Sequence, residues 1–117
     1  MLTSFGRCLR KLRIDNGELL KDMAANLGIT ASYLSAVENG KRPIPKDWLT
    51  QLHEIYQLDD NHFEELRLAA IDAADSITLS LQETKLANKE VAFVFARKVE
   101  SLPSDKLEKI KKLLEDE

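Results

Sequence analysis

The sequence has few of the residues that mark several large protein classes. A single cysteine, Cys8, excludes an internal disulfide and agrees with a reducing compartment. The longest purely apolar run, residues 91–96, is far shorter than the roughly 18 residues that a membrane span requires, and the N-terminus lacks the apolar stretch of a secretory signal. Four glycines and three prolines among 117 residues argue against disorder. We therefore expect a globular, cytoplasmic protein with no membrane partner.

Charge is unevenly distributed along the chain. The formal net charge of −3, taken for the whole sequence, argues against a nucleic-acid partner. Residues 1–46, however, contain eight basic and four acidic side chains, a net charge of +4. Residues 47–117 contain nine basic and sixteen acidic side chains, a net charge of −7. Either this imbalance is a solvated surface without further meaning, or the two parts meet different partners.

Helical periodicity dominates residues 1–74. Apolar residues recur at helical spacing in five successive stretches, which are separated by residue types that end helices or begin them. The breaks fall at Asn16-Gly17, at Gly28, at Asn39-Gly40, in the loop 41–45 and before Asp59-Asp60. The sequence therefore predicts a mainly α fold that begins with a bundle of five helices.

The periodicity changes after residue 75. Ile77, Leu79 and Leu81 alternate with polar residues, and this period of two predicts one short β-strand over residues 76–81. Alternatively, the segment continues the fifth helix or pairs within the monomer. Two further helical patterns follow, one beginning at Asn88 and one after Pro103.

A lone strand suggests a second copy of the chain. Its backbone groups are unpaired in a monomer, and isolated strands are unstable in water. The same strand from a second copy would pair with it in a two-fold arrangement. We therefore predict a domain over residues 1–74 and a dimerisation segment over residues 75–117. The residues expected at the dimer interface are Ile77, Leu79, Leu81, Val94, Phe95 and Val99.

Residues 20–40 carry a two-helix motif. A small residue stands where two short helices must touch, a turn glycine follows four residues later, and apolar residues then continue at helical spacing. These motif positions are Ala24, Gly28, Leu34 and Val37. The stretch MAANLGITASYLSAVENGKRPIP resembles the XRE, or lambda-repressor-like, helix-turn-helix family, and the resemblance covers roughly residues 5–73. It implies a five-helix bundle whose third helix enters the DNA major groove, and a dimer on a partly palindromic operator.

The outward face of the third helix is the expected reading surface. A helical wheel of residues 31–39 places this face opposite Leu34 and Val37. Hydroxyl groups can bond base edges, methyl groups can touch thymine, and basic or polar groups nearby can bind phosphates. The predicted base contacts are Ala31, Ser32, Ser35 and Ala36, and the predicted phosphate contacts are Lys21, Tyr33, Asn39, Lys41 and Arg42. Alternatively, the serines are solvated surface, the basic residues decorate a loop, and Tyr33 is a packing residue.

One acidic residue of the motif is expected to be structural. Glu38 lies near the inward side of the third helix, where an unpaired carboxylate would be costly. In the family that this chain resembles, the corresponding glutamate commonly pairs with an arginine of the first helix, and Arg13 occupies the matching place.

The start of the second helix departs from the family pattern. Members typically carry a capping Ser or Thr followed by a Gln that contacts DNA, whereas this chain has Leu19 and Leu20. One usual polar contact is therefore missing, and the operator sequence cannot be inferred by analogy.

Nothing in the sequence indicates catalysis, a metal or a cofactor. His53 and His62 lack metal-ligand spacing, and no CxxC or glycine-rich phosphate loop occurs. We therefore predict a sequence-specific DNA-binding transcriptional regulator, a homodimeric repressor that covers a promoter. The promoter of its own gene and those of phage or mobile-element genes are the candidates, and an anti-repressor is a candidate protein partner. The alternative is an antitoxin that binds DNA through the same domain and a protein partner, such as a toxin, through the acidic C-terminal part. A small-molecule sensor or an enzyme is less favoured.

Overall fold

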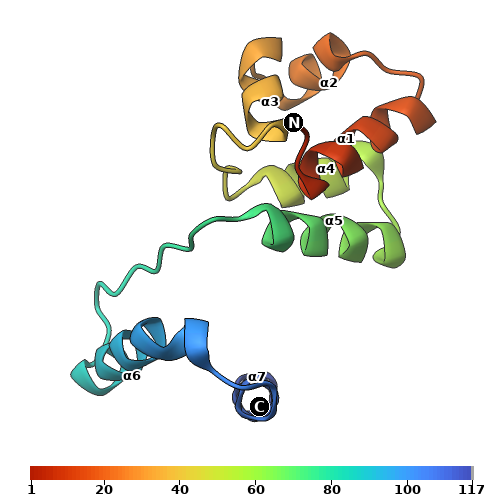
Figure 1. Ribbon diagram of the computed structural model, residues 1–117. Coiled ribbons are helices and arrows are strands. Elements are labelled where there is room, and N and C mark those ends of the chain that lie inside the picture. Colours follow the sequence, from red (N-terminus) through yellow and green to blue (C-terminus); the bar gives the residue numbers. More distant parts are fainter. Residues whose placement is uncertain (117) are drawn as a thin grey trace. The chain divides into compact units, whose positions relative to one another are not determined.

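A computed structural model describes residues 1–116 and divides into two compact units, Met1–Ile77 and the part that begins at Thr78. All regular elements of the described residues are helical (Figure 1), so the prediction of a mainly α fold is confirmed. The first unit contains α1 (Ser4–Asp15), α2 (Leu20–Leu27), α3 (Ala31–Glu38), α4 (Trp48–Tyr56) and α5 (Asp60–Ala73). The second contains α6 (Leu86–Lys98), a 3₁₀ helix (Val99–Ser101) and α7 (Ser104–Glu115). None of the helices described is both long and apolar enough to cross a membrane.

A short turn joins α2 to α3. Gly28 ends α2 with a φ of 72°, a left-handed conformation that strains any residue with a side chain. Two residues later the Thr30 hydroxyl accepts a hydrogen bond from the backbone N–H of Tyr33 at 3.1 Å and begins α3. These local signals place the two short helices against each other at a defined angle.

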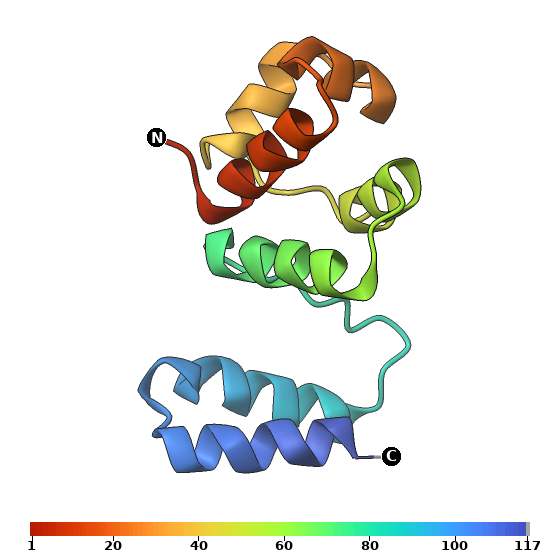
Figure 2. The ribbon, with the colours of Figure 1, turned by 90° about the vertical axis from the view of Figure 1, so that its right-hand side faces the viewer.

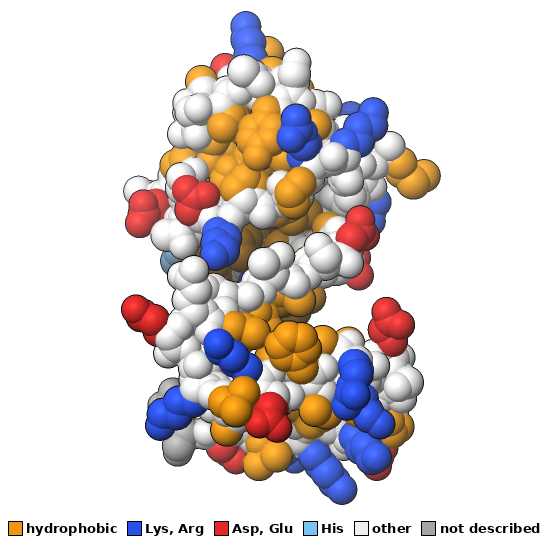
Figure 3. Space-filling model, turned by 90° about the vertical axis from the view of Figure 1, so that its left-hand side faces the viewer, with side chains coloured by type: hydrophobic (Ala, Val, Ile, Leu, Met, Phe, Trp, Pro, Cys, Tyr) orange, Lys and Arg blue, Asp and Glu red, His pale blue; other side chains and the backbone are white. Residues whose placement is uncertain are grey.

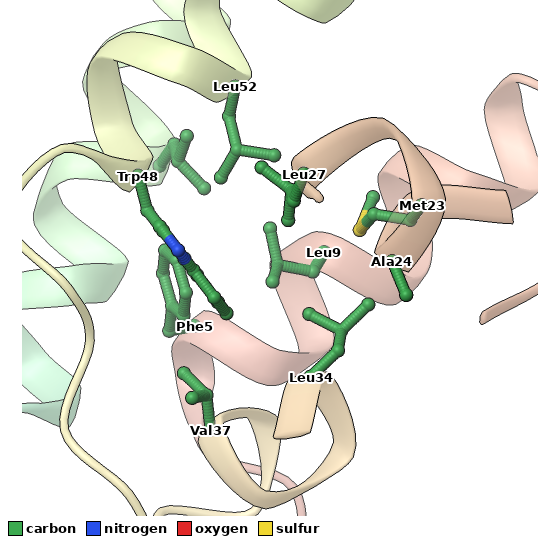
Figure 4. Packing of buried hydrophobic residues seen from close by; sticks show 10 residues of the cluster. Phe5, Leu9, Met23, Ala24, Leu27, Leu34, Val37, Trp48 and Leu52 are labelled. Atoms are coloured by element: carbon green, nitrogen blue, oxygen red, sulfur yellow. The ribbon is translucent and has the colours of Figure 1, made fainter. Parts of the chain in front are cut away.

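The hydrophobic core of the first unit lies around α1. Leu9 and Phe5 of α1 are fully buried, and Figure 4 shows side chains from α2, α3 and α4 converging on them. The buried apolar residues are Phe5, Leu9, Met23, Ala24, Leu27, Leu34, Val37, Trp48, Leu52 and Leu66. Because α3 contributes Leu34 and Val37 to this core, its opposite side is left for contacts outside the protein.

α1 and the end of α3 approach each other closely at Gly6. The backbone N–H and the hydroxyl of Thr3 both donate to the Glu38 carbonyl oxygen, at 2.9 and 3.1 Å. The Thr3 hydroxyl oxygen also accepts from the Gly6 N–H at 3.0 Å and thereby caps α1. A Cβ on Gly6 would lie 2.2 Å from the Glu38 carbonyl oxygen, so this approach requires glycine.

Residues 76–81 do not form the predicted β-strand. They have no regular secondary structure, and no strand occurs anywhere in residues 1–116 to pair with them. Alternation of apolar and polar residues identifies the two sides of an extended segment, but it cannot supply the backbone partner that a strand needs. Ile77 and Leu79 are accordingly 83% and 61% exposed, and α5 has already ended at Ala73. The strand prediction is therefore wrong.

The second unit is a pair of helices without a core. α6 begins at Leu86, two residues before the predicted start at Asn88, and α7 returns in the opposite direction (Figure 2). Among residues 78–116 no side chain is buried. The buried core of the described chain therefore belongs to the first unit alone.

The two units also differ in charge. Residues 47–77, which contain α4 and α5, have one basic and eight acidic side chains, a net charge of −7. Residues 78–117 have eight of each, a net charge of zero. The acidity attributed to the C-terminal part therefore belongs to the first unit, and the description of that part as acidic is corrected.

Candidate nucleic-acid interface

The surface of α3 is short and polar. Ser32 is exposed and Ser35 and Ala36 are half-buried, whereas Leu34 and Val37 on the other side are buried in the core. Ala31 is also half-buried but packs against the core. Three of the four residues predicted to contact bases thus lie on the open side of the helix, and Ala31 lies at its edge.

Two of the residues predicted to contact phosphates are engaged inside the protein. The Tyr33 ring packs edge to face against Trp48, with ring centroids 6.0 Å apart and an interplanar angle of 78°, so only its hydroxyl can serve a phosphate. The Asn39 side-chain amide donates to the Ser35 carbonyl oxygen at 2.8 Å and to the Ser35 hydroxyl at 3.4 Å. Asn39 thereby closes the end of α3, and a phosphate contact would require its amide to turn away.

Three exposed basic side chains flank this surface in the sequence. Lys21 lies in the first turn of α2, and Lys41 and Arg42 lie in the loop that follows α3. The Lys41 N–H donates to the Ala36 carbonyl oxygen at 2.9 Å, which ties the loop to the helix end. Within residues 1–116 none of the three forms an ion pair, so their charges are available to an anionic partner.

The same loop borders an open groove in the first unit. The groove has a volume of about 870 Å³ and is enclosed by residues 40–46 on one side and the end of α5 on the other. Ile44 and Leu49 in its wall pack against the core and anchor the loop. On the face shown in Figure 3, Lys and Arg side chains and Asp and Glu side chains both border the hydrophobic ones.

The start of α2 presents an apolar residue to solvent. Leu19 stands at the N-cap position, makes no side-chain capping bond, and is 63% exposed. The Asp22 carboxylate accepts from the Leu19 backbone N–H at 2.8 Å and stabilises the helix start instead. The departure from the family pattern at Leu19 and Leu20 thus leaves no side-chain amide at this place.

A buried ion pair fixes α3 on α1. The Arg13 guanidinium donates to both carboxylate oxygens of Glu38, at 2.5 Å from Nη1 and 3.1 Å from Nη2, and the two residues are 7% and 3% exposed. Nη1 also lies 3.5 Å from the sulfur of Met23 in α2. One guanidinium therefore connects three helices, and its two-pronged geometry holds α3 at a defined angle.

Burial changes the pKa of two further side chains in the first unit. Burial, and then the nearby Glu65 carboxylate, raise the pKa of the Cys8 thiol, which disfavours the nucleophilic thiolate. Burial and a 2.6 Å hydrogen bond to Glu18 raise the pKa of Tyr56 to about 12, so its hydroxyl remains a donor. No group of three His, Cys, Asp or Glu side chains in residues 1–116 is arranged to hold a metal ion.

Comparison with known protein families agrees with this geometry. Residues 4–66, more than half of the chain, match the family model described as a helix-turn-helix domain. No curated protein and no solved structure matches the chain. The matched region runs from the start of α1 into α5 and includes α2, α3 and the loop after them. Domains of this kind are typically non-enzymatic, and they imply DNA binding. The chain belongs to the helix-turn-helix domain family, which is consistent with its resemblance to XRE-type regulators.

Proposed function

We propose that the chain is a sequence-specific transcriptional regulator that represses a promoter as a homodimer. The observation that carries the proposal is the construction of α3. Its polar side is open, its apolar side is anchored in the core, and the Arg13–Glu38 pair holds it against α1. Such a helix suits the major groove, where hydroxyl and methyl groups can distinguish base pairs.

Dimerisation supports this function by extending the site that is read. One short helix covers only a few base pairs, whereas two held about 34 Å apart read two half-sites one turn apart. We propose residues 1–74 as the DNA-binding domain and residues 75–117 as the part that dimerises. Ile77, Leu79 and Leu81 contribute to the interface as exposed or half-buried apolar side chains, without a strand.

The experiment that tests this function is selection of bound sequences from a random DNA pool with the full chain. We expect enrichment of a motif with two inverted half-sites whose centres are about one helical turn apart. The promoter of the chain's own gene is the first natural site to compare with that motif. A pool in which no motif is enriched would contradict sequence-specific binding.

Replacing Ser32 with alanine is expected to change base preference at one position of each half-site. A direct hydroxyl contact is worth about 1–3 kcal/mol of discrimination between bases, and the substitution removes it without disturbing the buried side of α3. Fluorescence anisotropy on a set of single-base variants of the selected site measures the change. Ser80→Ala, an exposed serine outside the first unit, is the matched control. If Ser32→Ala weakened binding equally on every single-base variant of the site, Ser32 would have no role in distinguishing bases.

Replacing Lys41 or Arg42 with alanine is expected to weaken binding to all DNA sequences. Each lost phosphate contact should lower the slope of log affinity against log salt by about one unit per subunit. Titrations at several salt concentrations give the slope. Lys111→Ala removes one positive charge from α7 and is expected to leave the slope unchanged. A slope that stays the same in both loop variants would reject their role.

An antitoxin remains the second candidate function, because the C-terminal part exposes apolar residues that a protein partner would cover. Its net charge of zero gives no support to an electrostatic attraction for a basic toxin. A small open reading frame that abuts this one, whose product inhibits growth and is neutralised by this chain, would establish that function.

A further inference from the structure

The helices of the second unit expose many large apolar side chains. From Leu86 onward, nine large apolar side chains are each between 39% and 78% exposed. They are Leu86, Val91, Phe93, Val94, Phe95, Val99, Leu107, Leu113 and Leu114. Since a large side chain carries on the order of 200 Å² of surface, the nine together present on the order of 1,000 Å² of apolar surface to solvent.

This surface lies on more than one side of α6. Val91 and Val94 share one side of the helix, and Phe93 lies on another, yet these three are 70%, 47% and 67% exposed. A helix that is apolar on several sides is normally buried. α7 covers only part of this surface, since no side chain of residues 78–116 is buried.

The stability of α6 and α7 also requires that their exposed apolar side chains be buried against another surface. α6 and α7 have 13 and 12 residues, and isolated helices of this length are marginal in water. At the end of α7, Leu113 and Leu114 are 75% and 78% exposed, although Leu114 continues the apolar stripe of Leu107. A partner that supplies further apolar helices would bury both sets.

The charge of the unit identifies the kind of partner. Eight basic and eight acidic side chains give residues 78–117 a net charge of zero. A nucleic acid would favour a basic surface, and a strongly charged protein would favour an excess of the opposite sign. Two identical neutral units meet without net repulsion, and an exposed area on the order of 1,000 Å² per copy exceeds the roughly 800 Å² per partner of a standard interface.

We infer that α6 and α7 of two copies pack together as a four-helix bundle and bury these apolar side chains. This inference rests on the proposed function, because it names the surface through which the regulator dimerises. Two antiparallel helix pairs related by a two-fold axis form a closed bundle, to which no further copies add. Residues 74–85, which connect α5 to α6, can span up to about 40 Å when extended. This length allows the two DNA-binding units of a dimer to occupy half-sites about 34 Å apart.

The test is the mass of the full chain in solution, measured by sedimentation equilibrium without DNA. We expect a species of twice 13.3 kDa for the wild type. Val91→Glu and Leu114→Glu place a carboxylate at positions that are 70% and 78% exposed in the monomer, so each is expected to leave the monomer folded and to weaken dimerisation at least tenfold. The matched control is Leu68→Glu, the same change at a 53% exposed leucine of α5, which should leave the dimer intact.

Several results would overturn the inference. They are a monomeric wild type, a dimer that both α6 and α7 variants leave unchanged, and a dimer that dissociates with Leu68→Glu, which would place the interface in the first unit. DNA binding is measured separately, on the selected site and on one half-site. A monomer that still binds specifically would reject the bundle and the homodimer but keep sequence-specific DNA binding, whereas a dimer that selects no sequence would reject sequence-specific DNA binding and keep the bundle.

Discussion

Replacing Glu38 with alanine is expected to lower the free energy of unfolding of the first unit by about 3–5 kcal/mol. The substitution leaves the Arg13 guanidinium, which is only 7% exposed, without its carboxylate partner. A buried charge without a partner is far more costly than an exposed one. Urea unfolding followed by the fluorescence of Trp48, the sole tryptophan and 3% exposed in the core, measures the change.

Two comparisons separate this effect from the loss of a side chain. Arg10→Ala removes an exposed arginine one turn earlier in α1 and should change stability by less than about 0.5 kcal/mol. The double variant Arg13→Met with Glu38→Leu leaves no buried charge and should recover most of the lost stability. If Glu38→Ala were no more destabilising than Arg10→Ala, the pair would not be what holds α3. Folded Glu38→Ala protein should retain the wild-type base preference, because the carboxylate lies on the buried side of α3.

Replacing Gly6 with alanine is expected to destabilise the first unit by about 3 kcal/mol, the upper end of the cost of overpacking. The new Cβ would lie 2.2 Å from the Glu38 carbonyl oxygen and 2.9 Å from its carbonyl carbon, and neither backbone atom can rotate away as a side chain would. Relief requires α1 and α3 to separate, which also stretches the two hydrogen bonds from Thr3.

The predicted loss of stability in Gly6→Ala is opposite in sign to the usual effect of this substitution in a helix. In a helix interior without steric conflict, the change from glycine to alanine stabilises by about 1 kcal/mol. The same urea titration therefore distinguishes the two cases, and a stabilised Gly6→Ala protein would show that the helices do not approach as described. Gly17→Ala is the comparison, because a Cβ there meets no atom within 4 Å and only the positive φ of 64° opposes it.

The elements that local chemistry determines were accessible from the sequence. Gly28, Thr30 and Asn39 mark the ends of α2 and α3. Backbone preference and helix capping, which act at these positions, depend only on residues close in the chain. The strand over residues 76–81 failed because a strand depends on a distant partner that the described chain does not contain. Pattern alone reports which side chains share a face, and not whether a backbone partner exists.

Contacts between distant residues were only partly accessible. A glycine inside a helical pattern, such as Gly6, only lowers the helix propensity, and the structure is needed to identify the Glu38 carbonyl as the neighbour that requires it. The Tyr33–Trp48 contact and the internal hydrogen bonds of Asn39 carry no sequence signal that we can name. The neutrality of the second unit was missed because net charge was counted on either side of residue 46. The structural boundary falls 31 residues later, after Ile77.

The separation of charge within the first unit has a consequence for the approach to DNA. α2 and α3 lie on one side of α1 and α5 on the other (Figures 1 and 2); six of the eight acidic side chains of residues 47–77 lie in or beside α5. Residues 1–46 have a net charge of +4 and residues 47–77 a net charge of −7, so the negative charge of the unit is concentrated around α5. For the proposed function, the field of the phosphates repels encounters through the acidic α5 and so favours approach through the other side of the unit, where α2 and α3 lie. The acidity of α5 thus reduces the number of orientations in which the unit can approach DNA. Because salt screens this repulsion and attraction, it should slow association with DNA more than it speeds dissociation.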